Sequence, residues 1–253
     1  MGSIDTFQCS CTGSSGLERL RYFPRQLLTA DDMRVEQTYL REKQRRHNRF
    51  LHGWGVACGL LVQLNPTAGP LVVTVCPGYA LGPCGDEIDL PDPVDFDLTP
   101  TLQQLAQPNC ANPGLAAAFA STGLLSLAIR YAECQTRPVR TLPAGCGCDD
   151  STCEFSRMRD GFEIRCVALA KGSGTPLPPT LCEIQADIAN QLPPLSAAPT
   201  DDWVQLATIE LVGGGAGKPA KLDSQSIDNN ARRLLFSTTQ IQRQVVACCC
   251  QTT

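Results

Sequence analysis

Cysteines are the residues in this 253-residue chain whose type and spacing could do unusual chemistry, and there are 15 of them. Three lie in one short segment with the spacing C-x-C-x4-C, and others lie in the apolar runs on either side. If those runs form a hairpin, four thiolates could converge on a tetrahedral Zn²⁺ or on an iron–sulfur cluster. The sequence therefore suggests a metal site made by Cys134, Cys146, Cys148 and Cys153.

Two other roles stay open for these thiols. They could form disulfides that staple the loop, or pack as small apolar side chains. No basic stretch followed by an apolar run marks a secretory signal at the N-terminus, which lowers the expectation of disulfides. An odd number of cysteines also leaves at least one outside any intrachain disulfide. No cofactor is thus assigned with certainty, and zinc or an iron–sulfur cluster is the candidate group.

Enzymatic patterns are missing elsewhere in the sequence. His47 and His52 are the only histidines, so cysteine or serine chemistry with a downstream histidine has no base. The Gly-rich run at 213–218 fails as a phosphate loop, because Val212 stands at the first glycine position and Pro219 replaces the Ser or Thr that binds Mg²⁺. We therefore expect a binding or structural protein and no enzyme.

Composition narrows the class of partner. The net charge is −4 and the pI is about 5.2, which argues against a general nucleic-acid binder. Apolar residues at 43% and charged residues at 18% are enough for a globular core. No apolar run approaches the roughly 20 residues of a transmembrane helix. Together with the missing signal, this predicts synthesis in the cytoplasm and no membrane span.

A long helix gives the clearest local prediction. Thr29 and Asp32 form a capping box, no Gly or Pro interrupts the chain from Ala30 to about Phe50, and Gly53 ends the run. Its second half is strongly basic and its apolar stripe is narrow. Either this is a solvated face beside a packed stripe, or it is a docking surface for a protein partner. The docking hypothesis assigns partner contacts to Arg41, Arg45, Arg46 and Arg49, with the aromatic turn of Tyr22 and Phe23.

Short apolar runs separated by turn residues predict strands over 56–64, 71–76, 77–81, 87–90, 94–98, 124–134, 161–169 and 203–212. Shorter helical patterns cover 99–107, 179–191 and 229–246. Six acidic residues and no basic one lie within 86–97, which indicates a solvated edge strand better than a Ca²⁺ loop.

These elements predict an α+β protein with a long N-terminal helix, a mostly antiparallel β domain and a helical C-terminal tail. Four segments are expected: a flexible cysteine-containing arm (1–16), a helical docking segment (17–55), a β-rich domain (56–212) with a cysteine-rich insertion (135–157), and a tail with a helix (213–253).

Several stretches of this chain follow a recurrent pattern: Tyr22 to Asp32, Glu36 to Tyr39, Glu42-Lys43, His47 to Val56, Val73 to Ala80 and Gly85 to Pro91. They resemble the opening of uncharacterised structural proteins of phage-tail-like contractile injection systems. The resemblance covers about residues 20–91 well, and more loosely 203–209 and 227–233. It departs at Arg25, where those proteins have Gly, and in the cysteine-rich middle.

The resemblance implies a non-enzymatic structural subunit, at or near the baseplate, with no catalytic residues to carry over. Its partners would be other baseplate, tube or sheath subunits, and several copies would be incorporated into a symmetric tail-like particle. The alternative is a zinc- or iron–sulfur-binding protein with a redox or sensing role.

Overall fold

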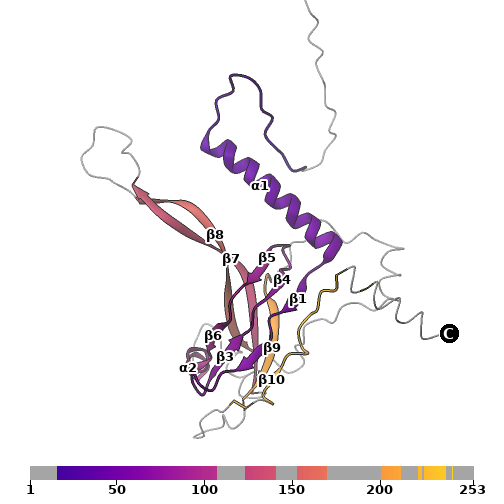
Figure 1. The fold of residues 1–253 in the computed structure, drawn as a ribbon, viewed down its shortest axis with the longest axis vertical. Coiled ribbons are helices and arrows are strands. Elements are labelled where there is room, and N and C mark those ends of the chain that lie inside the picture. Colours follow the sequence, from indigo (N-terminus) through magenta and orange to yellow (C-terminus); the bar gives the residue numbers. More distant parts are fainter. Residues whose placement is uncertain are drawn as a thin grey trace, which may run out of the picture.

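The computed structural model describes residues 16–106, 123–140, 153–169, 201–211, 222–223, 225–237 and 241. Within these ranges the chain is mixed, with one long N-terminal helix and mostly antiparallel sheets, as the sequence predicts. A body of strands lies below helix α1, and a two-stranded ribbon extends upward from the body beside it (Figure 1). Among the described residues, no helix has the length and apolar character to cross a bilayer.

Helix α1 (Ala30–His47) begins where the capping box predicts. The Asp32 amide donates to the Thr29 hydroxyl, and the Asp32 carboxylate accepts from the Thr29 amide at 2.8 Å. The Thr29 hydroxyl also donates to the Asp32 carboxylate at 2.7 Å, and this bond, together with the one from the Thr29 amide, lowers the pKa of Asp32. The helix continues as one π-helical turn, η1 (Asn48–His52), and ends at Gly53, whose φ of +78° a glycine adopts without strain.

Three extended segments form the middle of the body, and each one bends halfway along. Each segment gives the strand on one side of its bend to one sheet and the strand on the other side to a second sheet. Two three-stranded sheets therefore arise, in the orders β1-β4-β5 and β2-β3-β6. All neighbours are antiparallel. The strands are β1 (Gly55–Gly59), β2 (Val62–Leu64), β3 (Val72–Val75), β4 (Gly78–Leu81), β5 (Glu87–Leu90) and β6 (Val94–Asp97).

The bends correct the prediction of one continuous strand over 56–64. Gly59 and Leu60 both have positive φ, +62° and +52°, which breaks the ladder between β1 and β2. A Cβ at position 59 would lie 2.1 Å from the Pro77 carbonyl oxygen, so only glycine permits this crossing of the two backbones. Pro77 lies at the same level in the next segment, and Pro91 and Pro93 separate β5 from β6.

A four-stranded antiparallel sheet, in the order β10-β9-β7-β8, covers the bent segments. Strands β7 (Leu124–Arg140) and β8 (Cys153–Ala168) are much longer than predicted, while β9 (Val204–Glu210) pairs with β7 only as far as Ile129. Beyond that point β7 and β8 continue alone as the ribbon, defined here as residues 130–140 and 153–163. The expected excursion over 135–157 is therefore strand at both ends, and 141–152 lies outside the described residues.

One aliphatic core joins all three sheets. It is built from alternate residues of the strands, in keeping with the low aromatic content of 6%. Short helix α2 (Thr99–Ala106) adds the partly buried Leu102 and Leu105 to it. The fully buried side chains include Val73, Val75, Ile88, Leu125, Leu127, Ile129, Leu206 and Ile209.

The tail departs from the predicted helix over 229–246. After β10 (Ile227–Asp228), residues 229–237 run without helical structure, and Leu234 forms an isolated parallel bridge with Val56. The Leu235 amide donates to the Val56 carbonyl at 2.8 Å, which holds this stretch against β1. Beyond it, only Ile241 is described and is helical. The predicted helix over 179–191 and the Gly-rich run at 213–218 lie outside the described residues.

Acid should loosen β6 through two carboxylates. Asp95 accepts hydrogen bonds from the Thr74 hydroxyl and the Asn65 amide, and Asp97 accepts from the Thr99 backbone amide. These bonds lower the pKa of both aspartates below 3.8. Because the folded-state pKa values are depressed, their contribution to stability is complete above that pH and disappears as the pH falls through the folded values.

We expect a variant with Asp95→Ala and Asp97→Ala to melt below the wild-type temperature at neutral pH, with the difference shrinking in strong acid. Thermal melts followed by circular dichroism measure this. Asp92→Ala, which removes an exposed carboxylate from the stretch between β5 and β6, is the control and should leave the melting temperature nearly unchanged. A difference that stays constant across the pH range would contradict the assignment.

Candidate docking surfaces

The end of α1 is fixed to the turn between β4 and β5. Asn48, only 4% exposed, donates its side-chain amide to the Gly85 carbonyl oxygen at 2.8 Å. Gly85 has a φ of +91°, and a Cβ there would lie 2.4 Å from the Arg45 carbonyl oxygen. The two backbones therefore meet without a side chain between them. We call this contact the junction.

Two predicted partner-binding arginines instead make ion pairs within the chain. Arg45 Nε lies 2.7 Å from Asp86 Oδ1, and its Nη1 lies 2.7 Å from Glu42 Oε1. Burial lowers the pKa of Arg45, but these two carboxylates outweigh it and the net shift is upward. Arg41 reaches the ribbon, with Nη1 at 2.6 Å from Glu133 Oε1. Both side chains thus hold α1 to its own body.

The other four residues predicted to contact a partner lie before α1, near its C-terminal end, or in η1. Arg46 is exposed, and within the described ranges it forms no ion pair. Arg49 lies with its guanidinium carbon 5.6 Å from the Phe50 ring centre. Tyr22 and Phe23 are 53% and 60% exposed, and the Tyr22 hydroxyl donates to the Glu36 carboxylate, so the N-terminal segment folds back on α1. A role of these four residues in partner binding stays a prediction.

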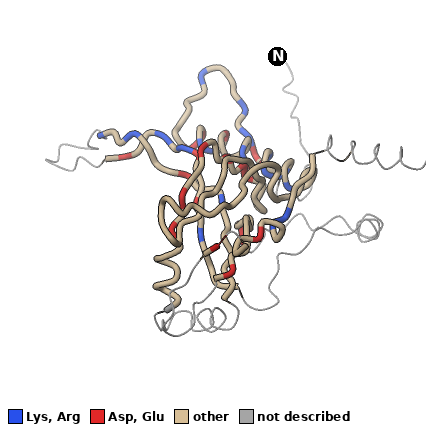
Figure 2. Tube along the Cα trace, turned by 60° about the horizontal axis from the view of Figure 1, so that its bottom comes forward, with Lys and Arg blue, Asp and Glu red and all other residues tan. Residues whose placement is uncertain are grey.

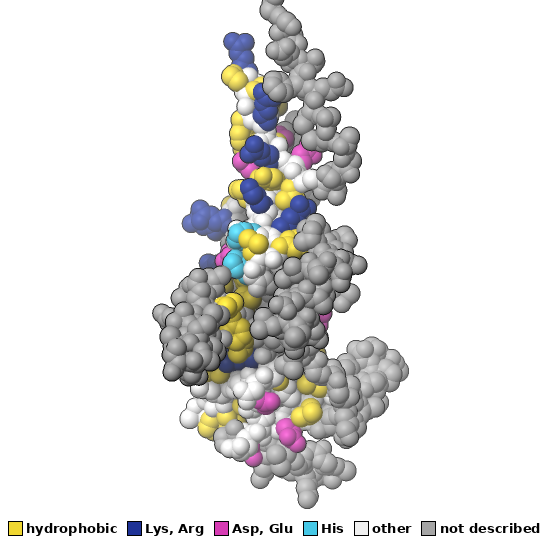
Figure 3. Space-filling view, turned by 90° about the vertical axis from the view of Figure 1, so that its right-hand side faces the viewer, with side chains coloured by type: hydrophobic (Ala, Val, Ile, Leu, Met, Phe, Trp, Pro, Cys, Tyr) yellow, Lys and Arg dark blue, Asp and Glu magenta, His cyan; other side chains and the backbone are white. Residues whose placement is uncertain are grey.

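Helix α1 has no buried residue. We define the α1 arm as residues 16–53, which touch the body at the junction and through Arg41. In Figure 3 the helix rises above the body with apolar and basic side chains side by side, and the two histidines lie at its base. Exposed apolar patches of this kind are typical of interaction sites. The large apolar residues exposed on the arm are Tyr22, Phe23, Leu27, Leu28, Met33, Val35, Leu40, Phe50 and Leu51.

The ribbon is a second exposed surface, and the sequence analysis missed it. Val139, Phe155 and Met158 are each about half exposed along it. Figure 2 shows that Lys and Arg mark both this ribbon and the loop before α1. Pro138 and the cysteines led to the prediction of a loop, whereas the strand pairing continues to Arg140 and Cys153. The alternation of apolar and polar residues over 153–156 was a short available signal, and it breaks at Arg157.

A cleft of about 370 Å³ lies between the end of α1, the β4–β5 turn and the base of the ribbon. Its charged side chains are largely occupied with one another through the Arg41 and Arg45 ion pairs. Burial, followed by the charge of Asp86, raises the pKa of the Cys84 thiol, so this thiol is protonated at neutral pH and is a poor nucleophile. Among the described residues that line the cleft, Arg41 and Arg45 are ion-paired and the Cys84 thiol is protonated.

The strand register separates two of the predicted metal ligands. Cys134 pairs with Arg159 and Cys153 pairs with Arg140, so six residue steps along β7 lie between them. At about 3.4 Å per residue that is roughly 20 Å, whereas two thiolates on one zinc ion lie within about 4 Å of each other. The proposed set of four therefore cannot share a single ion. Cys146 and Cys148 lie outside the described residues, and metal binding near Cys153 stays a prediction.

The other cysteines that the structure describes do not form a metal-binding cluster either. Within the described ranges, no three His, Cys, Asp or Glu side chains are arranged to hold a metal ion. Six thiols are seen free there, and Cys166 is the buried one, where burial raises its pKa to about 12.

Trp203 is a further contact that the sequence analysis did not single out. Its ring lies 4.7 Å from the Arg130 guanidinium carbon and 4.2 Å from that of Arg165. Ion pairs to Glu163 and Asp201 orient the two arginines. This group ties β7, β8 and β9 together at the point where the ribbon leaves the sheet, so its role is positional.

Comparison with known proteins gives little more. No protein-family model matches the chain, and none of the curated proteins matches it. Solved chains with a match include one from the structure of the type VI secretion system TssK-TssF-TssG baseplate subcomplex, at 13% identity and a TM-score of 0.37. The match covers 82% of this chain and 60% of the other, so this chain spans about three fifths of the solved chain's length. Because that TM-score is low, the functional argument rests on the surfaces described above.

The junction should govern the stability of the arm's attachment. Asn48→Ala leaves the Gly85 carbonyl without its buried partner, a loss of about 1–3 kcal/mol in the free energy of unfolding. Gly85→Ala strains a left-handed residue and forces the backbones apart, with a loss of about 1–3 kcal/mol. Urea denaturation measures both losses.

Gly82→Ala is the matched control in the same turn, because a Cβ there would meet its nearest neighbour, the Asp86 carbonyl oxygen, at an ordinary 3.5 Å. We expect this control to stay near the wild-type stability. Equal losses for Gly82→Ala and Gly85→Ala would show that the close approach to Arg45 does not set the stability of the turn.

Proposed function

We propose that this chain is a non-enzymatic structural subunit of a phage-tail-like contractile injection particle, placed at its baseplate. It would act through contacts with neighbouring baseplate, tube or sheath subunits. The observation that carries the proposal is the α1 arm: an 18-residue helix with no buried residue, preceded by a segment that exposes further large apolar side chains.

An isolated helix of this length is marginal in water, because tertiary packing of an apolar face normally supplies most of its stability. Burying one large apolar side chain contributes about 1.5–3 kcal/mol. Within the described part of the chain, α1 packs against the body only near its C-terminal end. Packing for the outer part of the arm would come from another chain.

Two further observations support a structural role. The ionisable groups around the cleft are paired or protonated, which is the state expected of a structural contact. The sequence resemblance to structural proteins of contractile injection systems covers residues 20–91, which include both the α1 arm and the junction. The proposed place in the particle rests on that resemblance.

Removing apolar contacts from the arm should reduce incorporation into particles. Phe23→Ala with Leu40→Ala truncates two side chains that are at least 60% exposed, so the free chain should fold as before. Because central apolar contacts carry most of an interface's energy, we expect recovery in purified particles to fall about tenfold or more. Quantitative mass spectrometry of those particles measures the subunit against the tube protein.

Leu61→Ala, an exposed apolar residue on the body, is the control and should leave recovery unchanged. Equal recovery of the arm variant and the wild type, with both chains folded, would refute the proposed assembly role of the arm. Absence of the wild-type chain from such particles would refute the proposed function as a whole.

A further inference from the structure

Charge is divided between two regions of this chain. The α1 arm has nine basic and five acidic residues. Residues 54–106, which supply β1 to β6 and α2, have six acidic residues and no basic one. The net charges are therefore +4 and −6. Such a division gives the molecule one basic and one acidic side.

The acidic residues concentrate on one exposed stretch. Alternation along β5 and β6 buries Ile88 and Leu90 and sends the carboxylates outward. Within the described part of the chain, none of the exposed ones forms an ion pair, and only Asp86, which is largely covered, meets Arg45. We call this surface the acidic face: Glu87, Asp89, Asp92, Asp95 and Asp97.

The arm carries matching basic residues. Arg34, Arg41 and Arg45 form ion pairs within the chain, and Arg49 is left out of the set; the other basic residues of the arm form no ion pair among the described residues. They lie among the exposed apolar side chains of the arm. Those that we assign to the contact are Arg19, Arg21, Arg25, Lys43 and Arg46.

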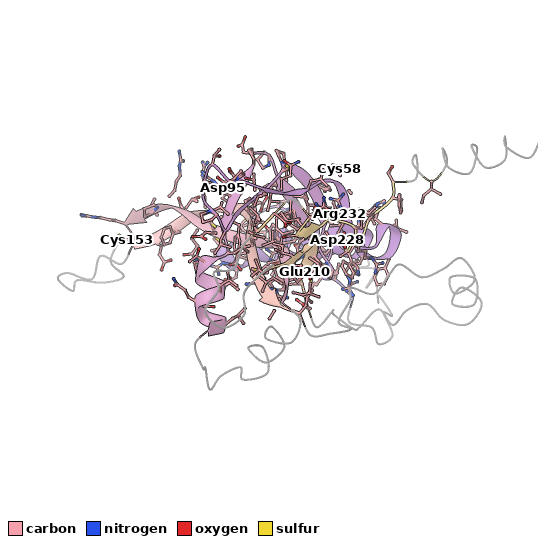
Figure 4. The ribbon with its side chains drawn as sticks, turned by 90° about the horizontal axis from the view of Figure 1, so that it is seen from below. Cys58, Asp95, Cys153, Glu210, Asp228 and Arg232 are labelled. Atoms are coloured by element: carbon pink, nitrogen blue, oxygen red, sulfur yellow. The ribbon has the colours of Figure 1, made fainter. Side chains whose placement is uncertain are left out.

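One chain cannot bring the two surfaces together. Helix α1 leads away from the junction for about 27 Å, at 1.5 Å per residue over 18 residues, and β6 lies at the opposite end of the body (Figure 1). Figure 4 looks at that lower end and labels Asp95 on it. Among the described residues, the Arg45–Asp86 ion pair joins the arm to the acidic stretch at the junction.

We propose that the acidic face of a second copy of this chain covers the α1 arm. The contact joins different surfaces of the two copies, and in the head-to-tail arrangement that we propose it repeats into a ring or a row. Apolar side chains of the arm supply the affinity, while the opposite charges steer the copies and fix their order. This inference rests on the proposed function and names one partner of the arm.

Reciprocal charge reversal tests the contact. An arm-reversed variant carries Lys43→Glu and Arg46→Glu, and a face-reversed variant carries Asp89→Lys and Asp92→Lys. The four side chains are exposed, so both variants should keep the wild-type circular dichroism spectrum. Sedimentation velocity of the purified full chain, over a range of concentrations and at low and high salt, measures self-association.

We expect the wild type to associate more strongly at low salt, and each variant alone to weaken association about tenfold or more, since like charges then meet in the contact. An equimolar mixture of the two variants should restore association, because each acidic arm then meets a basic face and each basic arm an acidic one. Restoration by mixing shows that the arm of one copy meets the acidic face of another, and growth beyond a dimer in sedimentation velocity shows that the contact is head-to-tail.

Matched controls place the same charge changes elsewhere. Arg157→Glu with Arg159→Glu lies on the ribbon, and Glu154→Lys with Glu210→Lys lies off the acidic face. Both should associate like the wild type. A wild type that stays monomeric throughout, reversed variants that associate normally, controls that fail equally, or a mixture that restores nothing would each overturn the proposal.

The test also separates this inference from the proposed function. A monomeric chain that still enters particles contradicts the head-to-tail contact and leaves the structural role standing. A chain that associates as expected but never enters particles contradicts the structural role alone.

Discussion

The junction between α1 and the β4–β5 turn is the contact on which the rest of the molecule depends. Gly85 lets the Arg45 backbone approach, and Asn48 satisfies the carbonyl that this approach buries. Arg45 then neutralises Asp86 beside it. Because the helix is fixed near one end only, its direction is set while its outer surface remains exposed. The same few atoms therefore decide both the stability of the attachment and the availability of the α1 arm.

The charged and apolar side chains that could contact a partner lie on the surface of this protein. The aliphatic core needs no charge, so acidic residues can occupy the outward positions of β5 and β6 without a basic residue anywhere in 54–106. The cleft beside the junction is lined by ion-paired side chains and by a thiol whose pKa is raised. Two projecting elements, the arm and the ribbon, carry most of the large apolar side chains that are exposed in the described part of the chain. Such a division favours assembly over catalysis.

Local signals in the sequence predicted local structure well. The capping box of Thr29 and Asp32 and the meander of short strands follow from patterns a few residues long. Contacts between distant segments were not predictable in this way. The bend at Gly59 depends on Pro77, and the pairing of Arg41 with Glu133 joins residues 92 apart. The metal-site hypothesis placed Cys134 and Cys153 on one ion. The strand pairing holds them far apart, because the ribbon continues where a loop was expected.

The central claim is that another chain covers the α1 arm in the assembled state. Hydrogen–deuterium exchange of residues 16–53, compared between the free monomeric chain and the chain within its assembly, tests this most directly. The account predicts that amides in the outer half of α1 exchange rapidly in the free chain and become strongly protected on assembly, while those of the buried strands change little. Equal exchange of the arm in both states would contradict it.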